Sequence, residues 1–364
     1  MSHDASYIIR DGEQQQYFYS RWGGVQLASD LLQGPEAFQD YVRGLKRLER
    51  PFLENYITSL AEIDLQQRRL RYWGIDGFGY DALSWRMHCA LLQSQWPGWT
   101  IEWLYQPADA MQVAETRVHT SQVTVADVQA WQSALWHDLK ERFTDLIEQQ
   151  GEAATRAMFE TPYDQFNTWV TVRSEQGLRD EILCNQFLLA HAELFLLGPD
   201  LVEVLEARPQ RPFNELQPNE SDLSACCFID LVEQRFFWWV LTPCWDPPYD
   251  IQKAWPGWEV EVLTEGPTRQ LTLTGRAPSA LRTSYSLTQL DEWFNSLLEP
   301  RQSPLELLTK VADNMAQRSG GNVEITLPGK DSEGIPQTPT WINDVKRHYA
   351  ALLNTPAFQP RLDR

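Results

Sequence analysis

Two pairs of aspartates and one histidine–cysteine pair are the residues in this 364-residue chain whose types and spacing could do chemistry. Asp64 corresponds to Asp230, and Asp81 to Asp250, because each pair occupies the same place in two similar stretches of sequence. Two carboxylates in one cleft, with tryptophans to stack a sugar ring, would suit a glycosidase. An aspartate beside a turn can equally accept hydrogen bonds from the local backbone. A carbohydrate-active enzyme, or a glycan-binding protein using the same tryptophans, is therefore the alternative function.

His88 and Cys89 stand next to each other in the stretch WRMHCALL. A cysteine nucleophile needs its base within hydrogen-bond reach, and adjacent residues of a helix or strand point their side chains apart. We therefore expect no cysteine hydrolase. Cys226 and Cys227 are also adjacent, in a strand pattern, and should fill the core. None of the six histidines has another at helical spacing, so the sequence predicts no metal site and no cofactor.

Glycine-containing stretches give no nucleotide-binding signature. GIDGFG (74–79) has its glycines in the wrong order for a dinucleotide-binding loop and is typical of a turn. PGKDS (328–332) lacks the first glycine of a phosphate-binding loop and carries Asp331 where Ser or Thr should stand. We therefore predict no catalytic residues.

Acidic aromatic loops are the remaining candidates for function. FGYD (78–81) and CWDPPYD (244–250) occupy corresponding positions, and in WEVEVL two glutamates alternate along one face of an expected strand. Aromatic side chains supply contact area in protein interfaces, while carboxylates steer and pair with a basic partner. The partner-binding residues predicted on this basis are Asp76, Phe78, Tyr80, Asp81, Trp245, Asp246, Tyr249, Asp250, Glu259 and Glu261.

The four-residue word WPGW occurs twice, at 96–99 and 255–258, which are 159 residues apart. The likeness extends in both directions, over 62–136 in the first copy and 228–298 in the second. Both copies contain Ile-Asp-Leu, followed nine residues after the aspartate by a tryptophan. Pro and Gly favour a turn, and each Trp can close an edge of the core. WPGW is thus expected to mark a duplicated structural turn rather than a ligand cage.

Strand and helix patterns follow one another around these words. CFIDLVEQRFFWWVL and WTIEWLYQ alternate and are rich in β-branched and aromatic residues, and helical spacing then follows a Thr or Ser that could cap the helix start. The predicted fold class is α+β: two related units, each a small antiparallel sheet followed by a helix, with additional helices between and after them. The expected domains are 1–150, 151–300 and a C-terminal helical segment, 301–364, packed on the rest.

Further elements are expected outside the repeat. Two apolar runs around Asp-Gly-Glu predict a hairpin over 7–24. The segment 180–207 is expected to include a buried helix that joins the two units, and the Pro-, Asn- and Gln-rich stretch 208–222 to be an exposed connection. Other helical patterns lie at 24–33, 34–60, 305–319 and 340–354.

The whole chain carries 50 acidic and 31 basic residues, which gives a net charge of −19. Such a field repels phosphate backbones, so nucleic acid is not an expected partner, and it favours a basic protein. The first residues lack the pattern of a signal peptide, and no run approaches the roughly 18 apolar residues that cross a bilayer. Five cysteines without framework spacing suit a reducing compartment. The chain is therefore expected to work in the cytoplasm, away from membranes.

In overall type the chain resembles the bacterial immunity proteins that neutralise polymorphic toxins inside the producing cell. The resemblance rests on the opening hairpin YIIRDGEQQQYFYSRWGG, the acidic aromatic loops and the absence of a catalytic motif. It implies a stoichiometric complex with a cognate toxin domain, blocking its active site or holding it in an inactive shape, and it carries over no residue roles. An immunity protein that is itself an enzyme, reversing the toxin's modification, stays open. We accordingly expect a non-enzymatic protein-binding inhibitor.

Overall fold

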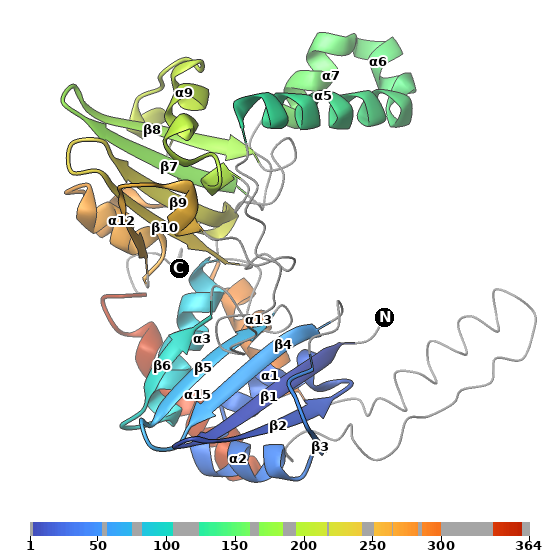
Figure 1. Cartoon of the computed structure of the whole chain (residues 1–364), viewed down its shortest axis with the longest axis vertical. Helices are drawn as coiled ribbons and strands as arrows, with labels where there is room; N and C mark the ends of the chain where they lie inside the picture. Colours follow the sequence, from blue (N-terminus) through green and yellow to red (C-terminus); the bar gives the residue numbers. More distant parts are fainter. Residues whose placement is uncertain are drawn as a thin grey trace, which may run out of the picture. The chain divides into compact units, whose positions relative to one another are not determined.

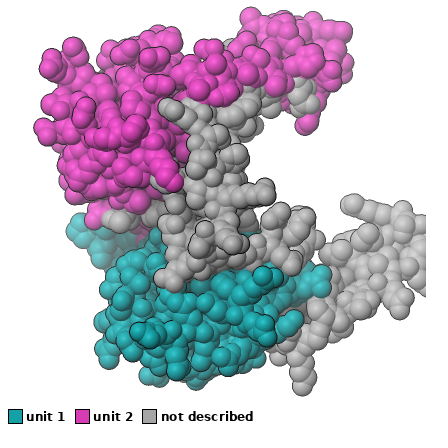
Figure 2. Space-filling model, in the orientation of Figure 1, with its two compact units in different colours: residues 1–79, 87–111, 287–359 teal, residues 80–86, 112–286, 360–364 magenta. Residues whose placement is uncertain are grey.

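The computed structural model describes residues 3–52, 57–74, 82–104, 124–160, 167–184, 194–216, 218–241, 251–263, 265–282, 286–299 and 338–358. The chain divides into two compact units that are discontinuous in sequence (Figure 2). Unit 1 comprises Met1–Gly79, Met87–Met111 and Leu287–Gln359; unit 2 comprises Tyr80–Arg86, Gln112–Ser286 and Pro360–Arg364. The expected boundaries at 150 and 300 do not coincide with these units, because helices late in the chain group with the first sheet.

Unit 1 is built on a six-stranded sheet with the order β3-β2-β1-β4-β5-β6 (Figure 1). β1 and β2 form the predicted hairpin, and Gly12 supplies a positive φ of 62° in its turn. β4 runs parallel to β1 and antiparallel to β5, while β6 runs parallel to β5. The strands are β1 (Asp4–Asp11), β2 (Gln14–Ser20), β3 (Lys46–Leu48), β4 (Ile57–Asp64), β5 (Arg69–Gly74) and β6 (Thr100–Trp103).

Unit 2 contains a five-stranded sheet with the order β11-β10-β9-β7-β8. Its strands take the places of β1, β2, β4, β5 and β6, with the same parallel and antiparallel neighbours. The predicted α+β class with two related sheet units is confirmed, but both sheets are mixed rather than antiparallel. The strands are β7 (Asn167–Ser174), β8 (Gly177–Cys184), β9 (Leu223–Asp230), β10 (Arg235–Val240) and β11 (Glu259–Val262).

The structural repeat is longer than the matched sequence, because it includes the first hairpin of each unit. β1 and β4 shift register between Asp4 and Ala5, and β7 and β9 shift at the equivalent step between Asn167 and Thr168. The tight turn that joins β4 to β5 is repeated between β9 and β10. Its last residue is Arg68 in the first copy, with a φ of 48°, and Gln234 in the second, with a φ of 52°. The backbone path is thus repeated even where the residues differ.

Two segments that the sequence indicated as helical contain strands. Among the described residues of the segment 34–60, Pro35–Arg43 is helical, and the last residues of the segment enter β4, where β-branched side chains fit a pleated sheet. The first residues of 180–207 belong to β8, which is the second strand of the repeated hairpin. The apolar run expected to form the buried helix begins at Phe187, and its residues up to 193 lie outside the described ranges, whereas Leu201–Glu206 further along the segment is helical. The helix expected at 305–319 lies outside the described residues.

Four helices of unit 1 gather on the same face of its sheet (Figure 1). Trp341 Nε1 donates to the carbonyl of Leu32 at 2.8 Å, which ties the last helix to the end of the first. Tyr349 stacks on Phe294 with ring centroids 3.8 Å apart. The helices are α1 (Gly23–Leu31), α2 (Pro35–Arg43), α13 (Leu287–Leu298) and α15 (Pro339–Leu353); α3 (Ala82–Gln95) lies between β5 and β6 along the chain.

Among three successive helices of unit 2, a tryptophan on the first makes contact with the third. Trp136 is 7% exposed, its Nε1 donates to Glu152 at 3.2 Å, and the cations of Lys140 and Arg156 lie 5.9 and 5.7 Å from its ring centroid. A capping box at Thr124 starts the first of them, as predicted. These helices are α5 (Val125–Arg142), α6 (Thr144–Gln150) and α7 (Glu152–Glu160); short helices nearer the sheet are α9 (Leu201–Glu206), α10 (Phe213–Leu216), α11 (Ile251–Ala254) and α12 (Pro267–Leu273).

The WPGW words form the same turn in both units, with an exposed Pro-Gly tip and a buried first tryptophan. Trp96 Nε1 donates to the carbonyl of Leu31 at 2.6 Å, and Trp255 Nε1 donates to that of Phe195 at 2.8 Å. Both tryptophans are 0% exposed. The indole N–H groups of these two tryptophans are occupied by backbone carbonyls within the fold, which confirms that WPGW marks a structural turn.

A glycine packs closely against the backbone at each of these turns: Gly34 in unit 1 and Gly198 in unit 2. The close approach at Gly198 predicts a loss of stability when a side chain is added there. Gly198 has a φ of 62°, and a Cβ there would lie 2.1 Å from the carbonyl oxygen of Ala254; Gly257, with a φ of 82°, faces open space. Gly257→Ala should cost about 1 kcal/mol from its left-handed backbone alone. Gly198→Ala adds a backbone clash and should cost at least about 2 kcal/mol more. Urea denaturation of both variants measures the difference, and equal losses would contradict the close approach.

Candidate functional site

Eight of the ten predicted partner-binding residues lie outside the described residues. They are Asp76, Phe78, Tyr80, Asp81, Trp245, Asp246, Tyr249 and Asp250. The other two, Glu259 and Glu261, lie on β11 and point to the same side, as the alternation in WEVEVL predicts.

β11 is an edge strand of its sheet, and its two glutamates share one arginine. Arg235 Nε lies 2.8 Å from Glu259 Oε2, and Arg235 Nη2 donates to Glu261. This second hydrogen bond is the main cause that raises the pKa of Arg235 above its usual value. The glutamate side chains stay 61% and 44% exposed. One positive charge against two negative charges leaves this edge acidic.

Asp64 and Asp230 hold the turns that follow β4 and β9. Asp64 Oδ1 accepts from two turn amides at 3.1 and 2.9 Å, and Asp230 Oδ1 accepts from the two equivalent amides at 3.1 and 3.2 Å. The other oxygen of Asp230 is ion-paired with Arg173. The turn interpretation of these two aspartates is confirmed. The second pair, Asp81 and Asp250, lies outside the described residues.

His88 is fully buried in unit 1, and its neighbour Cys89 is half-buried. His88 Nε2 donates to the carbonyl of Ala28 at 2.9 Å, and its burial lowers the pKa of the imidazole to about 4. Burial raises the pKa of the Cys89 thiol to about 12, against a weaker opposing effect of its hydrogen bond with Tyr72. A nucleophilic cysteine needs the opposite shift, so this pair is unsuited to covalent catalysis.

The buried imidazole predicts a loss of stability in acid. His88 stays neutral in the folded chain down to about pH 4, whereas the unfolded chain protonates it near 6.5. The unfolded state therefore binds more protons between these values, and stability falls by about 3 kcal/mol as the pH drops from 6.5 to 4. Urea denaturation at pH 7 and pH 4.5 should show a smaller loss for His88→Gln than for the parent chain. An equal loss in both would remove His88 as the cause.

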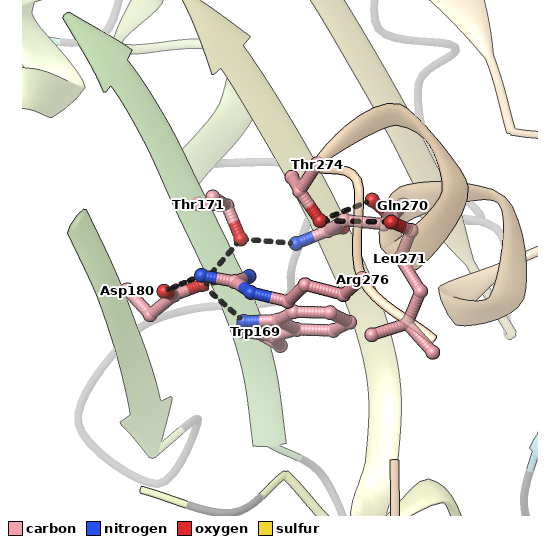
Figure 3. Close-up of polar contacts among 7 residues, drawn as sticks. All are labelled: Trp169, Thr171, Asp180, Gln270, Leu271, Thr274 and Arg276. Atoms are coloured by element: carbon pink, nitrogen blue, oxygen red, sulfur yellow. Dashed lines mark hydrogen bonds and ion pairs between the residues drawn. The ribbon is translucent and has the colours of Figure 1, made fainter. Parts of the chain in front are cut away.

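A buried polar network lies between β7, β8 and the segment around α12 of unit 2 (Figure 3). Asp180 is 3% exposed and forms two parallel hydrogen bonds with Arg276, at 2.9 and 2.5 Å. Asp180 Oδ1 also accepts from Trp169 Nε1 at 3.1 Å and from the Thr171 hydroxyl at 2.6 Å. Gln270 Nε2 donates in turn to Thr171 at 2.9 Å. The network therefore pins the segment around α12 to one face of the sheet.

This network has a structural role, because its polar groups are occupied by one another. The guanidinium of Arg276 also lies over the Phe213 ring, 4.0 Å from its centroid. Because the carboxylate of Asp180 is filled by charged and neutral donors, it has little capacity left to act as a base. Sequence reasoning missed the pair: Asp180 fell in a segment taken as helical, and Arg276 is 96 residues further along the chain. If 177–184 had been assigned as a strand, Asp180 and Glu181 would have stood out as two adjacent acids inside a sheet.

A second buried charge cluster, in unit 1, shows the same structural role. Glu62 is 1% exposed and pairs with Arg10 and Arg71, each at 2.5 Å. Glu62 and Arg71 are cross-strand partners, and the equivalent partners in unit 2 are Phe228 and Phe237, which stack with centroids 5.7 Å apart. An ion pair in one copy thus takes the place of an aromatic pair in the other, which is the behaviour of a packing contact.

A small pocket of about 130 Å³ opens where β7, β8 and β9 meet α10. Arg211, Glu215 and Asp222 supply the charges of its lining. Arg211 is paired with buried Glu181 at 2.8 Å.

Within the described ranges, no group of three or more His, Cys, Asp or Glu side chains is arranged to hold a metal ion. None of the described helices has the length and apolar character of a membrane span. No family model, curated protein or solved structure matches this chain.

Proposed function

We propose that this chain is a stoichiometric protein-binding inhibitor of a basic partner, of the immunity-protein type, which neutralises a toxin domain in the cytoplasm. The observation that carries the proposal is the contrast between its reactive and its exposed groups. Asp64, Asp230, His88 and Cys89 are committed to turns and core, whereas the glutamates of β11 are exposed.

The net charge of −19 supports a basic partner. A strongly negative surface raises the rate at which a positive protein is encountered and suppresses binding of acidic proteins. The acidic β11 edge supplies one place where such a partner could pair.

Affinity capture from a lysate of the source cells tests the proposal. The tagged chain is the bait, an unrelated acidic protein of matched net charge is the control, and both are washed at low and then moderate salt. We expect one basic protein to stay on the bait in a stoichiometric amount and to leave the control. Retention of the same proteins by both baits, or of none, would contradict the proposed function.

A further inference from the structure

We propose that the outer side of β11 is a strand-addition site for an extended basic segment with Lys or Arg at alternate positions. This inference rests on the proposed function and names the site and the partner chemistry. An exposed sheet edge can accept a further strand, with backbone hydrogen bonds giving affinity and alternate side chains giving specificity.

Within the described ranges, the backbone of β11 pairs with another strand on one side only. β11 pairs in parallel with β10, and the amides of Glu259 and Leu263 donate to β10 or its preceding turn at 3.0 and 2.8 Å. Alternate residues of an edge strand turn their amides and carbonyls away from the sheet, which here are Val260 and Val262. Among the described residues, no backbone hydrogen bond to another segment uses these outward groups.

The side chains of β11 select the charge of the added strand. Glu259 and Glu261 lie on one face, while Val260 and Val262 are half-buried on the other. A strand alongside would place its alternate side chains within about 4.5–5.5 Å of these glutamates, where opposite charges stabilise the pair and like charges oppose it. Arg235 balances only one of the two carboxylates.

The two edges of the first sheet provide an internal comparison. β6 is the edge strand of unit 1 that corresponds to β11, but Thr100 stands in place of Glu259, and only Glu102 is acidic. β3, at the opposite edge, carries exposed Lys46 and Arg47, which would repel a basic segment. Charge therefore favours β11 over both edges of the first sheet.

Binding of a labelled synthetic peptide of four Lys-Thr repeats tests the site. Val260→Pro removes an outward amide that β10 does not use, and Ile101→Pro is the matched change on β6. Fluorescence anisotropy should show binding to the parent chain and to Ile101→Pro, with at least tenfold weaker binding to Val260→Pro. Glu259→Gln with Glu261→Gln should weaken binding as well. A Val260→Pro variant that stays folded by circular dichroism and binds unchanged would overturn strand addition.

A peptide variant keeps the test valid if the proline variant does not fold. N-methylation of alternate peptide amides keeps the lysine charges but removes the ladder donors, so we expect it to abolish binding to the parent chain. Equal binding of the methylated peptide, or no binding of the unmethylated one, would also overturn the proposal. The two hypotheses separate cleanly: a captured basic protein that binds Val260→Pro normally would leave the proposed function standing and remove this site.

Discussion

Asp180→Ala should destabilise the chain by about 3–5 kcal/mol, because it leaves a charged partner without its counter-ion in a mostly buried site. Arg276 is 16% exposed, and its guanidinium would face an apolar ring and no carboxylate. The side chains of Trp169 and Thr171 would lose their acceptor in the same step. Chemical denaturation monitored by tryptophan fluorescence measures the loss.

A surface pair gives the control for this prediction. Asp344 lies 3.0 Å from Arg347 but is exposed, so Asp344→Ala should change stability by less than about 1 kcal/mol. Replacing both members of the buried pair, with Asp180→Leu and Arg276→Met, should recover much of the loss, since an apolar pair needs no counter-ion. If Asp180→Ala costs no more than Asp344→Ala, the described network does not hold α12 in place.

Trp255→Ala should cost about 3–5 kcal/mol, as truncation of a fully buried tryptophan does. The ring stacks on Phe236 with centroids 3.9 Å apart and planes 9° from parallel, and its Nε1 holds the carbonyl of Phe195. Trp255→Phe keeps a ring but leaves that carbonyl unsatisfied, so about 1–3 kcal/mol should be lost. Hydrogen exchange followed separately in the two units measures each loss where it occurs.

The first copy of the word provides the matched variants. Trp96 makes the equivalent hydrogen bond and is equally buried, so Trp96→Ala and Trp96→Phe should reproduce the same order of losses in unit 1. A large loss in one unit with none in the other would contradict the equivalence of the two turns.

The repeated turns could be predicted from the sequence because their structure depends on particular side chains. WPGW and Ile-Asp-Leu are kept because an indole reaches a backbone carbonyl and a carboxylate caps a turn, and few other side chains do either. The first hairpins were not matched, since β1 and β7 share only Arg10 and Arg173 at equivalent positions. Pairing in a sheet uses the backbone, so alternation can persist after most identities are lost.

The candidate site was predictable only where it follows from local alternation. Glu259 and Glu261 fall on one face because side chains alternate along a strand, and the structure agrees. That β11 forms an edge depends on which strands pair, and that the buried acid Asp180 meets Arg276 depends on how the chain folds back. Neither follows from local pattern. The eight predicted partner-binding residues outside the described ranges stay predictions.

Titration of the captured partner's activity with the purified chain tests the central claim most directly. A stoichiometric inhibitor should abolish that activity at an end point of one chain per partner molecule, and the end point should not move with incubation time. Loss of activity at a small fraction of that ratio, deepening with time, would mean that the chain acts by turnover and would contradict the account.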